Sequence, residues 1–105
     1  MNIKKINKLS KLTKYFDLYK LLLTEKQQQL FELYYFKDYS LTEIASFHNV
    51  SRTSVYDILK TAERNLVDLE NKLKLNEINE ELIKLIDKIE DKKLRDDFFN
   101  LLKKY

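Results

Sequence analysis

The chain has 105 residues, of which 44% are hydrophobic and 35% are charged, and its formal net charge is +3. A chain of this length builds one hydrophobic core, so we expect residues 1–105 to form a single domain. It contains no glycine and no proline, which disfavours tight turns and β-hairpins and predicts an all-α fold. The lack of cysteine excludes disulfides and cysteine–zinc sites and fits a reducing compartment.

The sequence lacks the common motifs of enzymes and an apolar run of membrane-spanning length. It has no cysteine nucleophile, no glycine-rich phosphate loop and only one histidine, His48, which we expect to be a polar turn residue. We therefore predict no enzymatic activity, no cofactor and no metal site. No apolar run reaches the length of about 18 residues that a membrane helix needs, so we predict a cytoplasmic protein without membrane insertion.

Positive charge is concentrated at the N-terminus. Residues 1–20 contain six lysines and one acid, Asp17. Residues 21–65 contain five basic and six acidic side chains, and residues 66–105 contain nine basic and ten acidic ones. Since phosphate neutralisation supplies most non-specific affinity for nucleic acid, any strong attraction is expected from the N-terminal segment.

Residues 1–23 are predicted to form a basic amphipathic helix. Its apolar positions recur every three to four residues: Ile3, Ile6, Leu9, Leu12, Phe16, Tyr19 and Leu22/Leu23. The lysines that flank this stripe are Lys4, Lys8, Lys11 and Lys14. They can form the solvated face of a core helix, which we favour, or serve as auxiliary phosphate contacts.

The next helix begins with a capping box in which Thr24 pairs with Gln27. Its apolar stripe is Leu30, Phe31, Leu33, Tyr34 and Phe36. The aromatic residues of positions 34–39 could stack on single-stranded bases. However, Lys37 is the only basic residue nearby in the sequence, so we favour an aromatic core.

Residues 40–65 have the pattern of a helix-turn-helix. Ser40 and Glu43 form a second capping box. The short helix that follows is expected to pack through Leu41, Ile44, Ala45 and Phe47. Asn49 can then take the left-handed conformation of the turn, and Ser51 can cap the second helix. In this motif the second helix lies in the DNA major groove.

The exposed face of the second helix carries the candidate nucleic-acid contacts. Arg52 would reach a guanine edge or a phosphate, while Thr53 and Tyr56 would contact bases or backbone. Asp57 opposes DNA binding unless it orients Arg52 or accepts a hydrogen bond from a cytosine. The full set of candidates is Arg52, Thr53, Ser54, Tyr56, Asp57, Lys60 and Arg64.

The apolar rhythm continues beyond the part of the helix that DNA would need. It follows the heptad-like positions Val55, Leu59, Ala62, Leu66, Leu69 and Leu73. The second helix should therefore run to about Lys74 and close a helix-turn-helix core of residues 24–75. Asn76 or Asn79 is expected to cap the following helix.

Residues 76–105 are predicted to form a C-terminal helical tail with a joint at Glu90-Asp91. Its apolar stripe consists of Ile78, Leu82, Leu85, Ile89, Leu94, Phe98, Leu101 and Tyr105. This stripe can fold back on the rest of the chain or pair with another copy. We favour a homodimer, because the stripe is wider than a small monomer readily covers.

Several short stretches occur in a recognisable order: Thr24-Glu25-Lys26-Gln27, Leu33-Tyr34-Tyr35, Ser40-Leu41-Thr42-Glu43-Ile44-Ala45 and Val50-Ser51-Arg52-Thr53-Ser54-Val55-Tyr56-Asp57. This order resembles region 4 of bacterial sigma factors and, more closely, the YlxM family of low-GC bacteria, in which LYY, SL-EIA and VSR--VYD recur. The resemblance covers roughly residues 15–75. It implies a helix-turn-helix domain with an added N-terminal helix and C-terminal helices. Thr53-Ser54 replaces a more usual Gln-Ala pair, which alters the face that would read bases.

The resemblance implies a DNA-binding regulatory protein. The coding regions of YlxM-like proteins lie beside those of the signal recognition particle, which implies a role in that pathway. The alternative is a protein- or RNA-interaction module that binds a particle component without sequence-specific DNA recognition. With so little positive charge on the helix-turn-helix, we expect DNA binding to be weak and to need a dimer or a bound partner.

Overall fold

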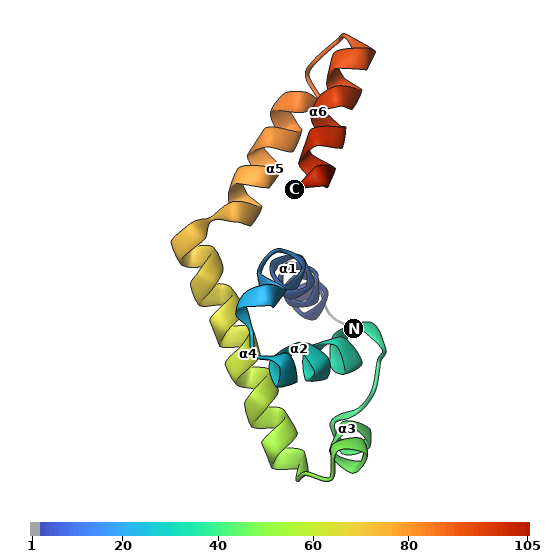
Figure 1. The fold of residues 1–105 in the computed structure, drawn as a ribbon, viewed down its shortest axis with the longest axis vertical. Coiled ribbons are helices and arrows are strands. Elements are labelled where there is room, and N and C mark those ends of the chain that lie inside the picture. The colour runs from blue at the N-terminus through green and yellow to red at the C-terminus, as the bar shows by residue number, and fades with distance from the viewer. Residues whose placement is uncertain (1–2) are drawn as a thin grey trace. The chain divides into compact units, whose positions relative to one another are not determined.

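The computed structural model of the chain describes residues 3–105, with side chains from Lys8 onward. Its helices are α1 (Ile3–Tyr19), α2 (Glu25–Phe31), α3 (Leu41–His48), α4 (Arg52–Leu73), α5 (Leu75–Ile86) and α6 (Lys92–Lys104) (Figure 1). A 3₁₀ turn at Lys20–Leu22 follows α1, and a π-helical turn at Glu32–Phe36 continues α2. The predicted all-α fold is confirmed, and no strand occurs in residues 3–105. The expectations for the side chains of Ile3, Lys4 and Ile6 lie outside the described residues.

The chain divides into two compact units, Met1–Leu73 and Lys74–Tyr105. The first holds α1 to α4, and the second holds α5 and α6. The expectation of a single domain over residues 1–105 stays a prediction. Among the helices in the described range, none is long and apolar enough to cross a membrane.

Helix α4 is the centre of the first unit, because α1, α2 and α3 all pack against it. Figure 1 shows these three shorter helices lying along one side of α4. The core consists of Leu12, Phe16, Tyr19, Leu23, Leu30, Phe31, Ile44, Ala45, Val55, Leu59, Ala62 and Leu66. Phe16 of α1 stacks on Phe31 of α2 with ring centroids 4.4 Å apart, which joins the two helices at the core centre. The heptad-like stripe of α4 is thus buried from Val55 to Leu66.

Local side-chain chemistry sets the starts of α2 and α3 as predicted. The Thr24 hydroxyl accepts from the Gln27 amide at 3.1 Å, and the Gln27 side chain accepts from the Thr24 amide at 3.0 Å. Ser40 and Glu43 make the same reciprocal pair at 3.0 and 3.1 Å. Each box satisfies two amides that the first helical turn leaves without a partner, so both capping boxes are confirmed.

The turn between α3 and α4 also follows its sequence. Asn49 ends α3 with φ 52° and ψ 43°, the left-handed conformation that asparagine tolerates better than most residues. The Val50 amide donates to the Ala45 carbonyl at 3.1 Å, and the Ser51 hydroxyl accepts from the Ser54 amide at 3.0 Å. The predicted helix-turn-helix therefore has its turn and its second cap in the expected places.

Some expected core positions are on the surface. Phe47 is 69% exposed, because Ile44 and Ala45 form the buried face of α3 and the last turn carries Phe47 away from it. Its ring stacks instead on Tyr39, with centroids 5.6 Å apart. Tyr34 is exposed as well. It lies in the π-helical turn, in which the Lys37 amide bonds to the Glu32 carbonyl at 3.1 Å, and this wider turn shifts the apolar stripe away from the expected α-helical spacing.

The start of α5 differs from its prediction. Neither Asn76 nor Asn79 caps this helix, because α5 begins directly at Leu75. Lys74 takes a left-handed conformation with φ 57° and provides no side-chain cap. The joint before α6 is confirmed, since the Asp91 carboxylate accepts from the Leu94 amide at 3.1 Å.

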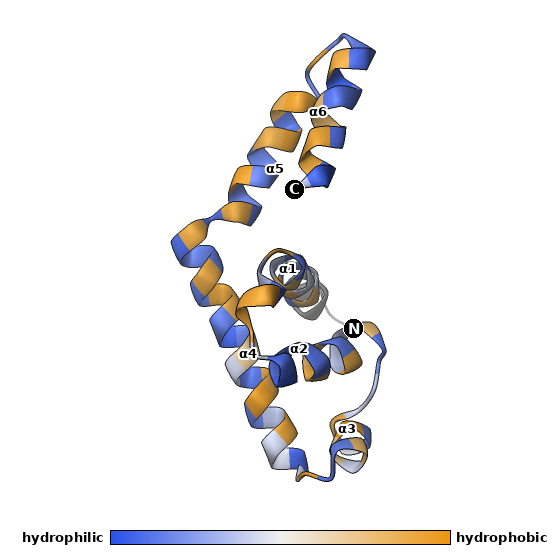
Figure 2. Ribbon diagram, in the orientation of Figure 1, coloured by the Kyte–Doolittle hydropathy of each residue, from blue (hydrophilic) through white to orange (hydrophobic). Residues whose placement is uncertain are grey.

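The second unit is a helical hairpin in which α5 pairs with α6. Only Ile86 is buried among its described apolar residues. Figure 2 shows apolar residues along both helices. The large exposed ones are Leu75, Ile78, Leu82, Ile83, Leu85, Leu94, Phe98, Leu101 and Tyr105. Two helices alone cannot enclose an apolar stripe of this width.

Candidate nucleic-acid interface

The N-terminal turns of α4 present the expected polar side chains. Arg52, Thr53 and Asp57 are exposed, and Tyr56 is 48% exposed. Ser54 is half-buried, and its hydroxyl accepts from the Ser51 hydroxyl at 2.9 Å. Ser54 is therefore held by the cap of α4, whereas Arg52, Thr53 and Asp57 are open to solvent.

Lys60 continues this face but is drawn into an interaction with Glu63. Its Nζ lies 3.4 Å from Glu63 Oε2 and 5.4 Å from the centroid of the Tyr56 ring. The negative charge of Glu63 is the main cause that raises the pKa of Lys60. Lys60 thus remains a cation, and its ammonium group lies between the Tyr56 ring and the Glu63 carboxylate.

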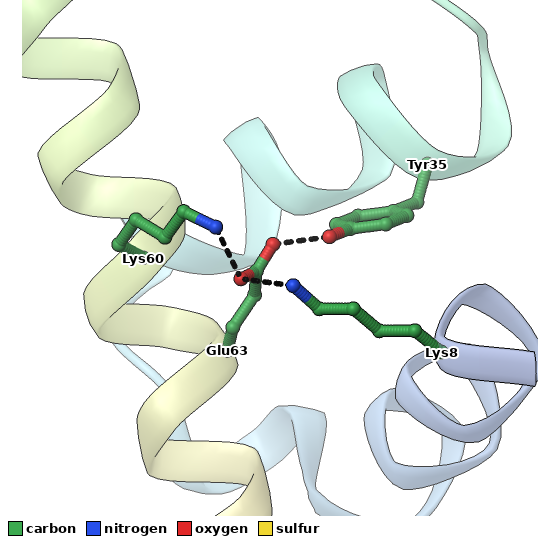
Figure 3. A network of polar contacts seen from close by, with 4 residues as sticks. All are labelled: Lys8, Tyr35, Lys60 and Glu63. Carbon is green, nitrogen blue, oxygen red and sulfur yellow. Dashed lines mark hydrogen bonds and ion pairs between the residues drawn. The ribbon is translucent and has the colours of Figure 1, made fainter. Parts of the chain in front are cut away.

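Glu63 is the central residue of a polar network that joins α1, the π-helical turn and α4 (Figure 3). Lys8 of α1 approaches Glu63 Oε2 at 3.8 Å, and the Tyr35 hydroxyl donates to Glu63 Oε1. The Glu63 side chain is only 12% exposed. Burial, followed by the hydrogen bond to Glu63 and its charge, raises the pKa of Tyr35 well above the usual range. Two lysines and a phenol therefore compensate one largely buried carboxylate.

A groove between α1 and α4 collects four of the predicted phosphate contacts. It is lined by Lys8, Lys11, Leu12, Tyr15, Lys60, Glu63, Arg64 and Val67. Lys8 and Lys60 share Glu63, whereas Lys11 and Arg64 have no ion-pair partner in the part of the chain that the structure describes. Lys14 is exposed on α1 but does not line this groove.

A second pocket shares Lys8, Lys60 and Glu63 with this groove. Its volume is about 580 Å³, which falls within the range of small-molecule sites. The π-helical turn, the loop after it and α3 supply the rest of its wall. The aromatic residues that line it are Tyr34, Tyr35, Tyr39 and Tyr56.

The sequence did not predict the polar contacts of Glu63 with Tyr35 and Lys8. The ion pair of Lys60 and Glu63 could be predicted from the sequence, because residues three positions apart are neighbours on a helix. The contacts of Glu63 with Tyr35 and Lys8 join positions 28 and 55 residues away, and no local pattern predicts such pairs. Packing of the helices creates this network.

Within the described residues no group of three or more histidine, cysteine, aspartate or glutamate side chains could hold a metal ion. His48 receives a hydrogen bond at Nδ1 from Lys26 Nζ at 3.2 Å, which ties the end of α3 to α2. The remaining arrangement is a capped α3–turn–α4 unit beside a cationic groove.

These features define a helix-turn-helix protein. The family model described as "Putative helix-turn-helix protein, YlxM / p13 like" matches residues 6–104. The chain belongs to this family, which confirms the resemblance found in the sequence.

Relatives in several bacteria are similar over most of the chain. A UPF0122 protein of Mycoplasma capricolum is 48% identical over 85 residues, which cover 81% of this chain and 75% of the relative. One from Caldanaerobacter subterraneus is 46% identical over 80 residues, with 76% and 68% covered. One from Lactococcus lactis is 45% identical over 91 residues, with 80% and 79% covered.

Proposed function

We propose that the protein is a DNA-binding regulator in which the start of α4 reads bases and the α1–α4 groove holds phosphates. The observation that carries this proposal is the convergence of Lys8, Lys11, Lys60 and Arg64 on one groove. This groove continues the face of α4 that a helix-turn-helix presents to DNA. A regulatory role of this kind calls for a binding surface and not for a catalytic one.

The base-contacting face and the groove form one continuous surface on α4. Arg52, Tyr56, Lys60 and Arg64 follow one another at intervals of four residues, so they share one side of the helix. The position of Lys60 Nζ 5.4 Å from the Tyr56 ring centroid places two of these side chains in contact. A duplex that received Arg52 in its major groove would therefore meet the cations of the groove along its backbone.

The electrostatics favour weak binding by one copy. Glu63 already neutralises Lys8 and Lys60 in part, so these two lysines attract phosphates less strongly than Lys11 and Arg64, the other cations of the groove. Each phosphate contact contributes about 0.9 to the slope of log affinity against log salt. We therefore expect a shallow salt dependence and an affinity that rises when two copies or a partner bind together.

The test is a duplex selected from a random pool, with binding followed by fluorescence anisotropy. Arg52→Ala should weaken the preferred duplex by about 1–3 kcal/mol and flatten its sequence preference. Lys72→Ala is the matched control, because Lys72 is exposed on the same helix but does not line the groove. Failure to select any duplex at low salt, with Arg52→Ala silent, would refute the proposal.

A regulatory role in the signal recognition particle pathway is part of this proposal, and the family resemblance supports it. A cytoplasmic location suits that role and is supported by the absence of cysteine. The second candidate is an interaction module that binds a protein or RNA of the particle. The exposed apolar residues of α5 and α6 favour it. If the protein is retained more strongly on the particle than on duplex DNA, and this retention resists salt, the result would favour the interaction module.

We also propose that α5 and α6 mediate a homodimer, since pairing two hairpins would cover the apolar residues that each leaves exposed. Replacing Leu82 and Ile89 with lysine should shift the mass in light scattering to that of the monomer. The control Glu81→Lys with Asp87→Lys adds positive charge at exposed polar positions and should leave the dimer intact. A monomeric parent would rule out the dimer.

A further inference from the structure

The tyrosine pocket, defined by Tyr34, Tyr35, Tyr39 and Tyr56, has features that reading a duplex does not require. The loop sequence alone offered the aromatic residues only one nearby cation, Lys37. The fold brings Lys8 from α1 and Lys60 from α4 to the same wall. Aromatic rings and two lysines thus meet at one site, although they are far apart in the sequence.

The rings at the rim are open enough to stack on a base. Tyr34 is 38% exposed, and it rests edge-to-face on Tyr35 with centroids 5.0 Å apart. Tyr39 is fixed by its stack on Phe47. Since every nucleobase has a π face, such supported but accessible rings bind unpaired bases with little dependence on sequence.

The two lysines at the pocket wall suit the phosphate of the same nucleotide. Lys8 and Lys60 lie 3.8 and 3.4 Å from Glu63 Oε2, so this carboxylate holds both ammonium groups at the shared wall of the pocket and the groove. A phosphate in the groove would leave its sugar and base at the entrance of the pocket.

Two further carboxylates that line the pocket can select the base. Asp38 and Glu43 line the pocket. One oxygen of Glu43 accepts from the Ser40 amide at 3.1 Å, whereas Asp38 has no hydrogen bond or ion pair within the described residues. The Watson–Crick edge of guanine presents two adjacent N–H donors that one carboxylate can accept together, which no other base offers.

We propose that the tyrosine pocket binds an unpaired nucleotide and prefers guanine. Tyr34 and Tyr56 stack on the base, Asp38 accepts from its Watson–Crick edge, and Lys8 and Lys60 hold the phosphate. This inference rests on the proposed function, because the two lysines belong to the phosphate groove. It adds a single-stranded ligand, or a base extruded from a duplex, to the duplex contacts of α4.

The test uses labelled single strands of about ten thymidines in which a central residue is kept or replaced by dG, dA or dC. The strand with central dG should bind about tenfold more tightly than the all-thymidine strand and should quench tyrosine fluorescence, the intrinsic signal of a chain without tryptophan. Tyr34→Leu should weaken this binding roughly 5- to 100-fold. Tyr105→Leu is the matched control, because Tyr105 is 92% exposed and outside the pocket.

Two further variants separate stacking from base selection. Tyr56→Leu removes the second stacking ring, which lies on α4. It therefore tests stacking independently if Tyr34→Leu fails to fold. Asp38→Asn should bring the affinity of the dG strand down to that of the all-thymidine strand. Asparagine tolerates the left-handed backbone of Asp38, at φ 58°, so the loop keeps its conformation.

The outcomes distinguish this inference from the proposed function. Equal binding of all four strands, with Tyr34→Leu and Tyr56→Leu silent while selected duplexes still depend on Arg52, would overturn the pocket and leave the duplex proposal standing. Absence of any nucleic-acid binding at low salt would overturn both.

Discussion

At the scale of single residues, Glu63 controls how much positive charge the groove can offer. Its carboxylate binds Lys8, Lys60 and the Tyr35 hydroxyl, and it is largely buried. A phosphate that approached either lysine would compete with this carboxylate. Glu63 therefore fixes the two ammonium groups in place but lowers their attraction for nucleic acid.

Glu63→Gln keeps the shape of the side chain and removes its charge. We predict tighter binding to duplex DNA and a salt slope that is steeper by about one to two, because each released lysine can neutralise a phosphate. Salt titrations by anisotropy measure this slope. Glu81→Gln, an equal change of charge at an exposed site of α5, serves as the control, and an equal gain in both variants would show that only net charge matters.

The phenol of Tyr35 makes the stability of the folded protein depend on pH in the alkaline range. Burial and Glu63 raise its pKa in the folded protein, so the unfolded chain loses this proton first. The free energy of unfolding should then fall as the pH rises above about 10, the ordinary value for tyrosine. Lys60, whose pKa Glu63 also raises, contributes in the same direction.

We predict that Tyr35→Phe flattens this loss of stability between about pH 10 and 12, relative to the parent. Urea unfolding at a series of pH values gives the comparison. Tyr105→Phe removes an exposed phenol and should follow the parent curve. Parallel curves for the parent and Tyr35→Phe would mean that the phenol gains no proton affinity on folding.

At the scale of elements, the approach of α3 to α4 depends on a small side chain. Ala45 is buried in the core next to Ile44, where α3 packs against α4. Ala45→Leu should lower the free energy of unfolding by about 1–3 kcal/mol, because added methylene groups have no space there. Chemical denaturation measures the loss, with the exposed Ser46→Leu on the same helix as the control. An unchanged midpoint for Ala45→Leu would place the helix crossing elsewhere.

The elements that the sequence predicted best depend on local chemistry. Both capping boxes and the left-handed Asn49 involve residues within a few positions of each other, so their patterns are readable directly. The start of α5 was mispredicted because Lys74 adopts a left-handed conformation without a capping side chain. Phe47 was mispredicted because apolar spacing alone does not reveal which side of a short helix faces the core: Ile44 and Ala45 are buried, whereas Phe47, in the last turn of α3, is exposed.

The candidate site was predictable only in part, for the same reason. The face of α4 from Arg52 to Arg64 follows from helical periodicity. The groove requires the packing of α1 on α4, and the tyrosine pocket requires α1, α3, α4 and the π-helical turn together. Such meetings of distant segments are set by tertiary packing, which single-sequence patterns do not encode.

At the scale of the whole molecule, the modest net charge conceals an uneven distribution. The chain carries a formal charge of only +3, yet four cations from α1 and α4 line one groove. Local concentration of charge, more than the total, decides where a polyanion binds. We therefore predict nucleic-acid binding that depends on a few identified side chains.

The most direct test is the salt dependence of duplex binding with two cations removed from the groove. Lys11→Gln with Arg64→Gln should reduce the slope of log affinity against log salt by about two, since each lost phosphate contact removes roughly 0.9. Lys103→Gln with Lys104→Gln removes the same charge from exposed positions at the end of α6 and should leave the slope unchanged. Equal slopes for the two double variants, or no duplex binding by the parent at low salt, would contradict the account.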